Sequence, residues 1–304
     1  MNIKLLSLRG LQFVTILSIS IFTFSCGSND GKKDGENADS TVVDSTGTED
    51  FSKAKQVFYS LPSPIETAML MKRAGAKYDE SILNSIENTS KYTTTISRSL
   101  NLGVYSADLS FASMFDQSQA TLNYIAATKK LADQLGMLTA IPKTIIDRME
   151  SNINNRDSLM EIISETFMNS NSLLKEDGRS EIAAIVLVGG WVEGLYIATK
   201  IAKTTKSNDE LVTRIIDQRL SLSTLMSLLD EYKDDENIAK LITELKNLEK
   251  VFEKIKITSS KIEPVTDSKT KVTTLKAKTE TSISPEVFEN LCNKVAEFRN
   301  NIIK

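Results

Sequence analysis

Apolar residues recur at helical spacing through most of the chain after residue 50. One stripe lies three or four positions apart at each step and consists of Ile96, Leu100, Val104, Ala107, Phe111 and Met114. Residues at this spacing share one face of an α-helix, and such a face is stable only when it is buried against another element. The pattern therefore predicts an all-α fold, built as a single multi-helix bundle or as stacked helical hairpins.

Helix start signals accompany this periodicity. Ser63 precedes Pro64, and Ser284 precedes Pro285. Serine is a favoured N-cap, and proline is tolerated at the first helical position. Together with the apolar stripes, these signals predict helices near residues 53–60, 64–75, 79–87, 91–115, 117–136, 142–153, 155–175, 180–203, 208–232, 235–256 and 285–303. Only Asp116 separates two of these helices, 91–115 and 117–136, so we expect them to form an antiparallel hairpin.

Residues 257–283 depart from the helical pattern. The segment is dense in Thr, Ser, Lys and Val, and residues 272–279 alternate in a way that is typical of a strand. The sequence predicts either a small β-hairpin or a long loop here, and it does not decide between them.

The first 26 residues have the order of a bacterial export signal. Lys4 and Arg9 precede an uncharged apolar run of about 14 residues at 11–24, and Ser25 and Cys26 end the segment. The run suits the apolar core of a signal peptide, and it is shorter than the roughly 20 residues that a helix needs to cross a bilayer. The pattern predicts export, followed by removal of residues 1–25.

This N-terminus resembles the lipobox of bacterial lipoproteins, particularly those of the Bacteroidota type. Ser25 fits the small residue that precedes the modified cysteine, whereas Thr23 stands where leucine is usual and Phe24 is bulky. The resemblance implies cleavage between Ser25 and Cys26 and attachment of acyl chains, such as palmitate, to Cys26. It also implies a lipid-anchored location at the outer membrane, facing the periplasm or the cell surface.

The remaining chain divides by composition into two parts. Residues 26–50 are rich in Ser, Thr, Gly and acidic residues and contain few large apolar side chains. Such a segment buries too little surface to offset its ordering entropy, so we expect an acidic, disordered tether. Residues 51–304 are enough for a helical domain with a substantial core.

The most apolar stretch after the signal lies at residues 182–198 and is interrupted mainly by Glu193 and glycines. A transmembrane helix and the central helix of a bundle both fit its composition. A glutamate at the bilayer centre would cost about 3 kcal/mol, so we favour the bundle. In that interpretation Trp191 anchors the core, and Gly190 and Gly194 let a neighbouring helix approach closely.

Two carboxylates fall on apolar helix faces. Asp108 and Glu193 have mostly apolar neighbours three and four positions away. A buried carboxylate needs a partner or a raised pKa that keeps it neutral. One interpretation is a polar pocket for a ligand or cation that is completed by Arg98 or Tyr196. The interpretation that we favour is structural, with each carboxylate paired inside the core.

The sequence excludes several function classes. It contains no histidine, which is the usual general base and the commonest zinc ligand, and no phosphate-binding or nucleophile-elbow motif. We therefore assign no catalytic residue and expect no cofactor or metal. The net charge of −3 becomes −5 when Lys4 and Arg9 leave with the signal, and the basic residues are dispersed, which argues against nucleic acid as a partner. Cys292 lies beside an apolar stripe and is expected to be a small buried hydrophobe.

Two functional hypotheses follow from these observations. The favoured one is a non-enzymatic, membrane-anchored envelope lipoprotein whose helical domain acts as a scaffold or binds an envelope protein or glycan. The alternative is a solute-binding protein or a carboxylate-dependent enzyme with an internal site around Asp108 and Glu193.

Overall fold

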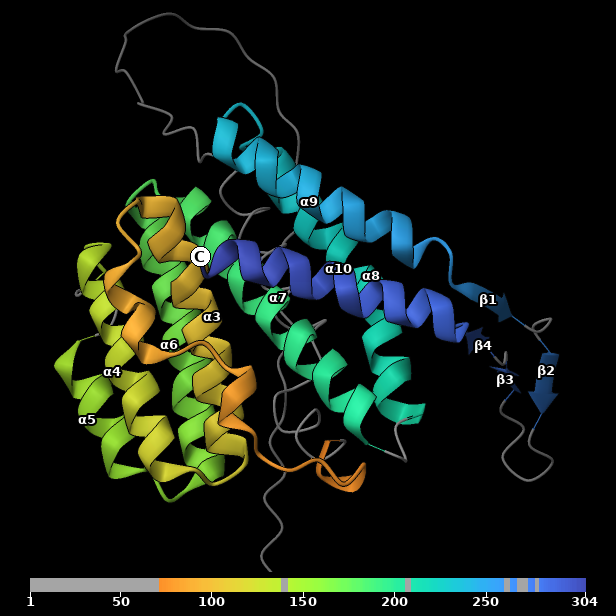
Figure 1. Ribbon diagram of the computed structural model, residues 1–304, viewed down its shortest axis with the longest axis horizontal. Coiled ribbons are helices and arrows are strands. Elements are labelled where there is room, and N and C mark those ends of the chain that lie inside the picture. Colours follow the sequence, from red (N-terminus) through yellow and green to blue (C-terminus); the bar gives the residue numbers. More distant parts are fainter. Residues whose placement is uncertain (1–70, 138–141, 206–208, 260–262, 267–272, 277–278) are drawn as a thin grey trace, which may run out of the picture. The chain divides into compact units, whose positions relative to one another are not determined.

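The computed structural model describes residues 71–137, 142–205, 209–259, 263–266, 273–276 and 279–304 (Figure 1). These residues fall within one compact unit, Asp44–Lys304. The signal and tether assignments and the predicted helix at 53–60 lie outside the described residues. The same is true of residues 64–70 of the next predicted helix, whereas residues 71–73 are helical.

The described chain is a helical bundle, which confirms the predicted fold class. Its α-helices are α3 (Thr95–Met114), α4 (Ser118–Gln134), α5 (Lys143–Ser151), α6 (Arg156–Glu176), α7 (Ser180–Thr204), α8 (Asp209–Asp230), α9 (Glu236–Phe252) and α10 (Pro285–Ile302). Each lies within a few residues of a predicted helix. The predicted cap at Ser284 is confirmed, because its side chain accepts a hydrogen bond from the Val287 N–H at 3.2 Å.

The prediction of an α-helix at 79–87 is wrong. Two 3-10 turns, η1 (Glu80–Ile82) and η2 (Ile86–Ser90), occupy this region, and the backbone is extended at Leu83. The cause is local capping combined with a tertiary contact. Asp79 caps the first turn, Ser85 caps the second, and between them the Asn84 N–H donates to the side chain of Asp108 at 3.1 Å. That donor is therefore unavailable to a continuous helix.

The predicted hairpin of α3 and α4 is confirmed. The turn between them places Asp116 in the left-handed region at φ 58°, and the Gln117 N–H returns to the carbonyl of Ala112 at 3.0 Å. This is a common way to end a helix, and aspartate tolerates the left-handed conformation better than most residues do. The two helices pack against each other along their length (Figure 1).

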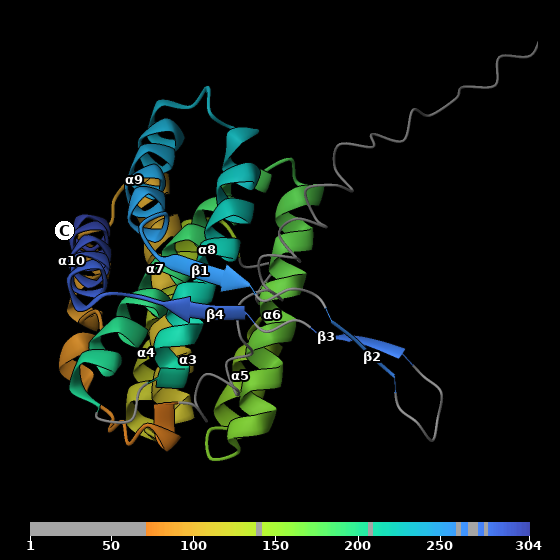
Figure 2. The ribbon, with the colours of Figure 1, turned by 90° about the vertical axis from the view of Figure 1, so that its right-hand side faces the viewer.

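Residues 256–282 contain paired strands, so of the two predicted alternatives the β-hairpin is observed and the long loop is not. Strand β1 (Lys256–Ser259) pairs antiparallel with β4 (Thr279–Ser282), and β2 (Glu263–Thr266) pairs antiparallel with β3 (Thr273–Lys276). The pairs are nested in sequence, as in one interrupted hairpin (Figure 2).

Helix α7 is the central helix of the bundle. It packs against α3, α6, α8 and α10, with α3 as its most extensive partner. It is long and apolar enough to cross a membrane, but 83% of its most apolar window is buried inside the protein. Trp191 is 2% exposed and donates a hydrogen bond from Nε1 to Oε1 of Gln218 at 3.2 Å, so it is a core residue as predicted.

Glycines allow α3 and α7 to approach each other at backbone distance. A Cβ atom added to Gly189 would overlap the backbone of Leu100, and one added to Gly103 would overlap the backbone of Val186 and Gly190. The predicted close approach at Gly190 is confirmed, because a Cβ there would lie 3.4 Å from the carbonyl oxygen of Gly103. The same prediction for Gly194 is wrong, since a Cβ at that position meets nothing within 4 Å.

Cys292 is buried at 5% exposure in α10, as predicted, and it is a free thiol. Burial raises the pKa of this thiol to about 11. A thiol that stays protonated at neutral pH is a weak nucleophile, so Cys292 acts as a small core residue.

Candidate functional site

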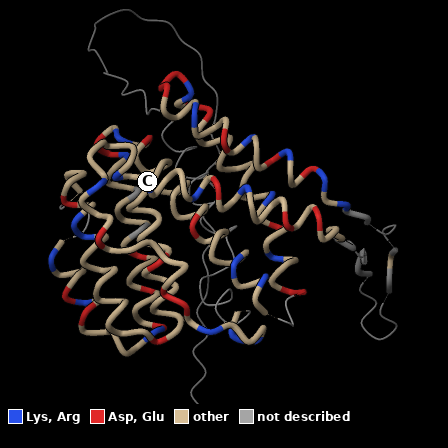
Figure 3. The backbone as a smooth tube through the Cα atoms, viewed as in Figure 1, with Lys and Arg blue, Asp and Glu red and all other residues tan. Residues whose placement is uncertain are grey.

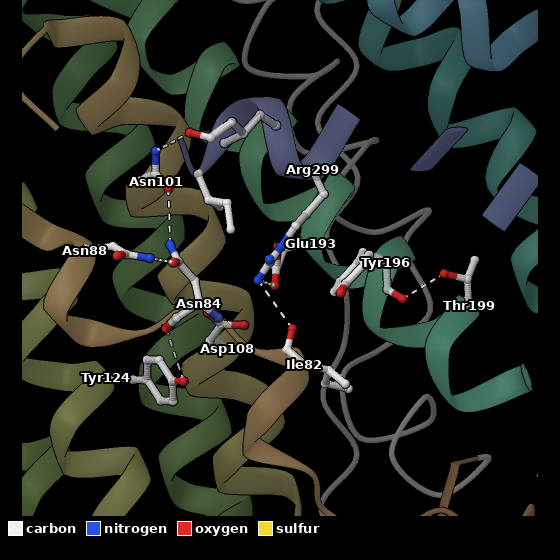
Figure 4. A network of polar contacts seen from close by, with 12 residues as sticks. Ile82, Asn84, Asn88, Asn101, Asp108, Tyr124, Glu193, Tyr196, Thr199 and Arg299 are labelled. Atoms are coloured by element: carbon white, nitrogen blue, oxygen red, sulfur yellow. Dashed lines mark hydrogen bonds and ion pairs between the residues drawn. The ribbon is translucent and has the colours of Figure 1, made fainter. Parts of the chain in front are cut away.

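The polar centre of the bundle is an ion pair between α7 and α10. Arg299 donates from Nε to Oε2 of Glu193 at 2.9 Å and from Nη2 to Oε1 at 3.0 Å (Figure 4). Glu193 is 0% exposed and Arg299 is 5% exposed. Nη2 of Arg299 also donates to the carbonyl of Ile82 at 3.3 Å, and the guanidinium lies 4.6 Å from the centre of the Tyr196 ring. The bidentate geometry and the aromatic contact are those that suit arginine in a dry environment.

Asp108 of α3 lies next to this pair and is 0% exposed. Its Oδ2 accepts the Asn84 N–H, whereas its Oδ1 accepts no hydrogen bond from a described donor. Burial, followed by the nearby charge of Glu193, raises the pKa of Asp108 well above its ordinary value. Burial at this position therefore favours the protonated form of Asp108.

Burial also raises the pKa of Glu193, but the hydrogen bonds and charge of Arg299 oppose that shift. The ion pair with Arg299 therefore favours the ionised form of Glu193. We call the cluster of Asp108, Glu193 and Arg299 the buried triad.

A chain of amide and hydroxyl groups surrounds the buried triad. Nδ2 of Asn84 donates to the Tyr92 hydroxyl at 3.0 Å and to Oδ1 of Asn101 at 3.3 Å. Asn101 in turn donates to the carbonyl of Ile302 at 2.9 Å, and the Tyr92 hydroxyl donates to the carbonyl of Ile303 at 3.4 Å. The last carbonyls of a helix lack intrahelical donors. This network supplies donors for the carbonyl of Ile302, the last residue of α10, and for that of Ile303 directly after it, and it ties the end of the chain to α3 and to the 3-10 turns.

The structure brings together three of the four residues that the sequence suggested for a polar pocket, namely Asp108, Glu193 and Tyr196 (Figure 4). It does not bring Arg98 to them. Nε of Arg98 donates to the carbonyl of Tyr92 at 3.1 Å, and that side chain is half-buried. Position 98 faces the start of its own helix, so it cannot also reach the centre of the bundle.

Sequence reasoning missed Arg299 and Asn84. A signal for Arg299 was present, because this residue interrupts the apolar face of 285–303, directly after Phe298 and four residues after Val295. A basic residue on a buried face needs an acidic partner in the core. Asn84 had no comparable signal, since it lies outside any periodic helix.

The chemistry open to the buried triad is limited. None of its members lines either of two clefts of the described chain, one between α3, α6, α7 and α8 and the other between α3, α7, α9 and α10. The described residues also contain no group of three His, Cys, Asp or Glu side chains that could hold a metal ion. The arrangement therefore joins α3, α7 and α10, and Asp108 is the one member with an unpaired acceptor.

An apolar cleft of about 300 Å³ lies between α3, α6, α7 and α8. Its α7 wall includes Gly190, Trp191, Gly194 and Ala198, and Glu193 is not part of it. Most of the lining surface is apolar, which is typical of small-molecule sites, and the volume lies at the lower end of their usual range of roughly 300–1,000 Å³.

Charged residues of both signs are interspersed along the helices (Figure 3). Several form exposed pairs within or between helices, such as Lys143 with Asp147 at 2.8 Å and Lys203 with Glu289 at 2.8 Å. Exposed pairs of this kind contribute little to stability.

Comparison with protein-family models, with curated proteins and with solved structures finds no match to this chain.

Proposed function

We propose that the protein is an envelope lipoprotein, anchored in the outer membrane through acylated Cys26, whose helical domain is a binding or scaffold module for an envelope component. The observation that carries the choice of a binding module over an enzyme is the state of the internal carboxylates. Both carboxylate oxygens of Glu193 accept hydrogen bonds from Arg299, and Asp108 is buried and lines neither of the two clefts described above. The location is supported by the order of Lys4, Arg9, the apolar run and Cys26.

Lipid attachment at Cys26 would make the anchoring durable. Each buried methylene contributes about 0.8 kcal/mol, a single acyl chain holds a protein only marginally, and two or three chains hold it stably. A tether of the composition of residues 26–50 has a typical span of roughly 25–30 Å. The helical domain would then remain close to the membrane surface, where envelope proteins, glycans and lipids are its available partners.

The alternative function, a solute-binding protein or carboxylate-dependent enzyme, has one observation in its favour. Oδ1 of Asp108 is buried and accepts no hydrogen bond from a described donor, and the pKa of this carboxyl is strongly raised by burial. Raised pKa values mark some catalytic acids, although structural clusters raise them as well. Since a substrate would need to displace the pairing of Glu193 with Arg299, we favour the binding module.

Crosslinking in intact cells tests the proposed function. We expect the wild-type protein to capture the same envelope component in repeated experiments, identified by mass spectrometry. The Cys26→Ala variant should lose that capture, because it is no longer held at the membrane. Folding of the variant is checked by circular dichroism on the purified protein.

Two results would contradict the proposal. One is capture of mainly cytoplasmic proteins by the wild-type protein. The other is an envelope crosslink whose yield is the same in the Cys26→Ala variant, since that would make the lipid anchor irrelevant to partner binding.

A further inference from the structure

One glycine of α7 makes no close helix contact in the described structure that would require a glycine. Glycine weakens the interior of a helix relative to alanine, so a helical glycine is expected to serve a close contact. Gly189 and Gly190 meet this expectation at the contact with α3, whereas a Cβ on Gly194 meets nothing within 4 Å. Gly194 is exposed, and it lines the apolar cleft. The missing side chain widens the cleft.

A second observation at the same cleft is an unsatisfied hydroxyl. Ser170 of α6 lines the cleft and is 7% exposed, and its Oγ has no hydrogen-bond partner among the described residues. Buried hydroxyl groups are normally paired, so an orphan in a cleft wall indicates a missing partner. Other hydroxyls of the lining are internally satisfied, as when Ser106 donates to the carbonyl of Leu102 at 2.7 Å.

The size and chemistry of the cleft restrict its ligand. A volume of about 300 Å³ suits one narrow aliphatic chain better than the paired chains of a phospholipid. Most of the lining residues are apolar, chiefly Leu, Ile and Met, so the cleft favours hydrocarbon over a sugar or a peptide. The described lining contains two basic residues, Lys129 and Arg214, and no acidic residue, which favours an anionic head group. Lys129 also forms an ion pair at 2.7 Å with Asp133 of its own helix, which lies outside the described lining.

We propose that the cleft between α3, α6, α7 and α8 binds the aliphatic chain of a straight-chain fatty acid, with Gly194 providing space for the chain. The assignment rests on the proposed binding function and names the class of its ligand. A domain held at a membrane surface is close to a source of such chains. The carboxylate end would lie toward the basic side chains of the lining, where opposite charge favours it.

Trp191 provides a local readout, because it is the only tryptophan of the chain and lines the cleft. The probe is 9,10-dibromostearic acid, whose bromine atoms quench a tryptophan at short range. The protein is the mature chain with Cys26→Ala, so that its own acyl groups cannot occupy the cleft. We expect saturable quenching of Trp191 with a dissociation constant in the micromolar range.

The test uses two cleft variants and a matched control. Gly194→Leu places a side chain in the open space. It should raise the dissociation constant of the probe about tenfold or more, which corresponds to about 1.4 kcal/mol of binding free energy. Ser106→Leu adds a larger side chain to the α3 wall of the cleft and should also weaken binding of the probe. The test therefore remains possible if one of the two variants fails to fold. Ser223→Leu adds the same side chain at an exposed position of α8 outside the cleft and should leave binding unchanged.

Absence of saturable quenching in the full mature chain overturns the proposal. Equal probe affinity in Gly194→Leu, Ser106→Leu and Ser223→Leu overturns it as well, because binding then lies elsewhere. The assay needs no membrane and no crosslink, so its failure is distinguishable from failure of the proposed envelope function.

Discussion

Replacing Arg299 with methionine is expected to lower the free energy of unfolding by about 3–5 kcal/mol, because the change leaves the buried charge of Glu193 without a partner. Methionine keeps much of the length of the side chain, so loss of packing is a minor part of the effect. Arg299 is 5% exposed and Glu193 is 0% exposed, so water cannot replace the lost donors. Urea denaturation followed by circular dichroism measures the change.

Arg148→Met is the matched control for this prediction. Arg148 makes an ion pair with Glu165 at 3.0 Å, but both side chains are nearly half exposed, at 47% and 45%. An exposed pair contributes about 0–1 kcal/mol, so the control variant should remain close to the wild type. Combining Arg299→Met with Glu193→Met should recover much of the loss, because it removes both charges. Equal destabilisation by Arg299→Met and Arg148→Met would show that the buried triad does not hold the helices together.

Gly189→Ala is expected to destabilise the protein by about 2–3 kcal/mol, although alanine is the better helix former. The added Cβ would lie 3.0 Å or less from the O, C and Cα atoms of Leu100, all of which belong to the backbone. Backbone atoms cannot rotate away as a side chain can, so α3 and α7 must move apart along their whole contact. Thermal and urea unfolding both report this loss.

Gly194→Ala is the control on the same helix, one turn further along. Its Cβ meets nothing within 4 Å, so the variant should be neutral or more stable by up to about 1 kcal/mol through helix propensity alone. The two substitutions are chemically identical, but only Gly189→Ala should destabilise the protein. A similar effect at both positions would contradict the close contact of α3 with α7.

The helices could be predicted from the sequence because their signals are local. Apolar spacing, together with caps such as Ser284 before Pro285, locates α10 to within a residue. The segment at 79–87 was mispredicted because its backbone depends on a distant residue. Asn84 donates to Asp108, 24 positions away, and no local pattern encodes that contact.

The candidate site was predictable only in part, for a similar reason. The neighbours of Asp108 and Glu193 on their own helices indicated that both point inward, and both are 0% exposed. The partner of Glu193 is Arg299, which is 106 residues away in sequence. Helical periodicity shows which residue is buried, whereas the packing of α7 against α10 decides what it meets.

The glycines of α7 also show that a local sequence pattern does not determine which residues meet in the tertiary structure. The sequence identified this stretch as a close-packing helix, but it could not decide which glycines face α3. The contact uses Gly189 and Gly190, and Gly194 faces open space instead. A rotation of α7 by part of a turn would exchange these roles, and that rotation is set by tertiary packing.

The buried triad and the apolar cleft therefore have different roles in this account. The triad joins three helices and lines neither of the two clefts described above, so its role is structural. The cleft is a space that the fold keeps open next to Gly194. A protein built in this way is suited to holding a ligand or partner at the membrane surface where the proposed lipid anchor would place it.

Mass spectrometry of the mature N-terminal peptide, purified from membranes of the native host, tests this anchoring most directly. We expect a peptide that begins at Cys26 and carries the added mass of two or three acyl chains. An unmodified peptide that begins at another residue would contradict the lipid anchor and the envelope function that depends on it.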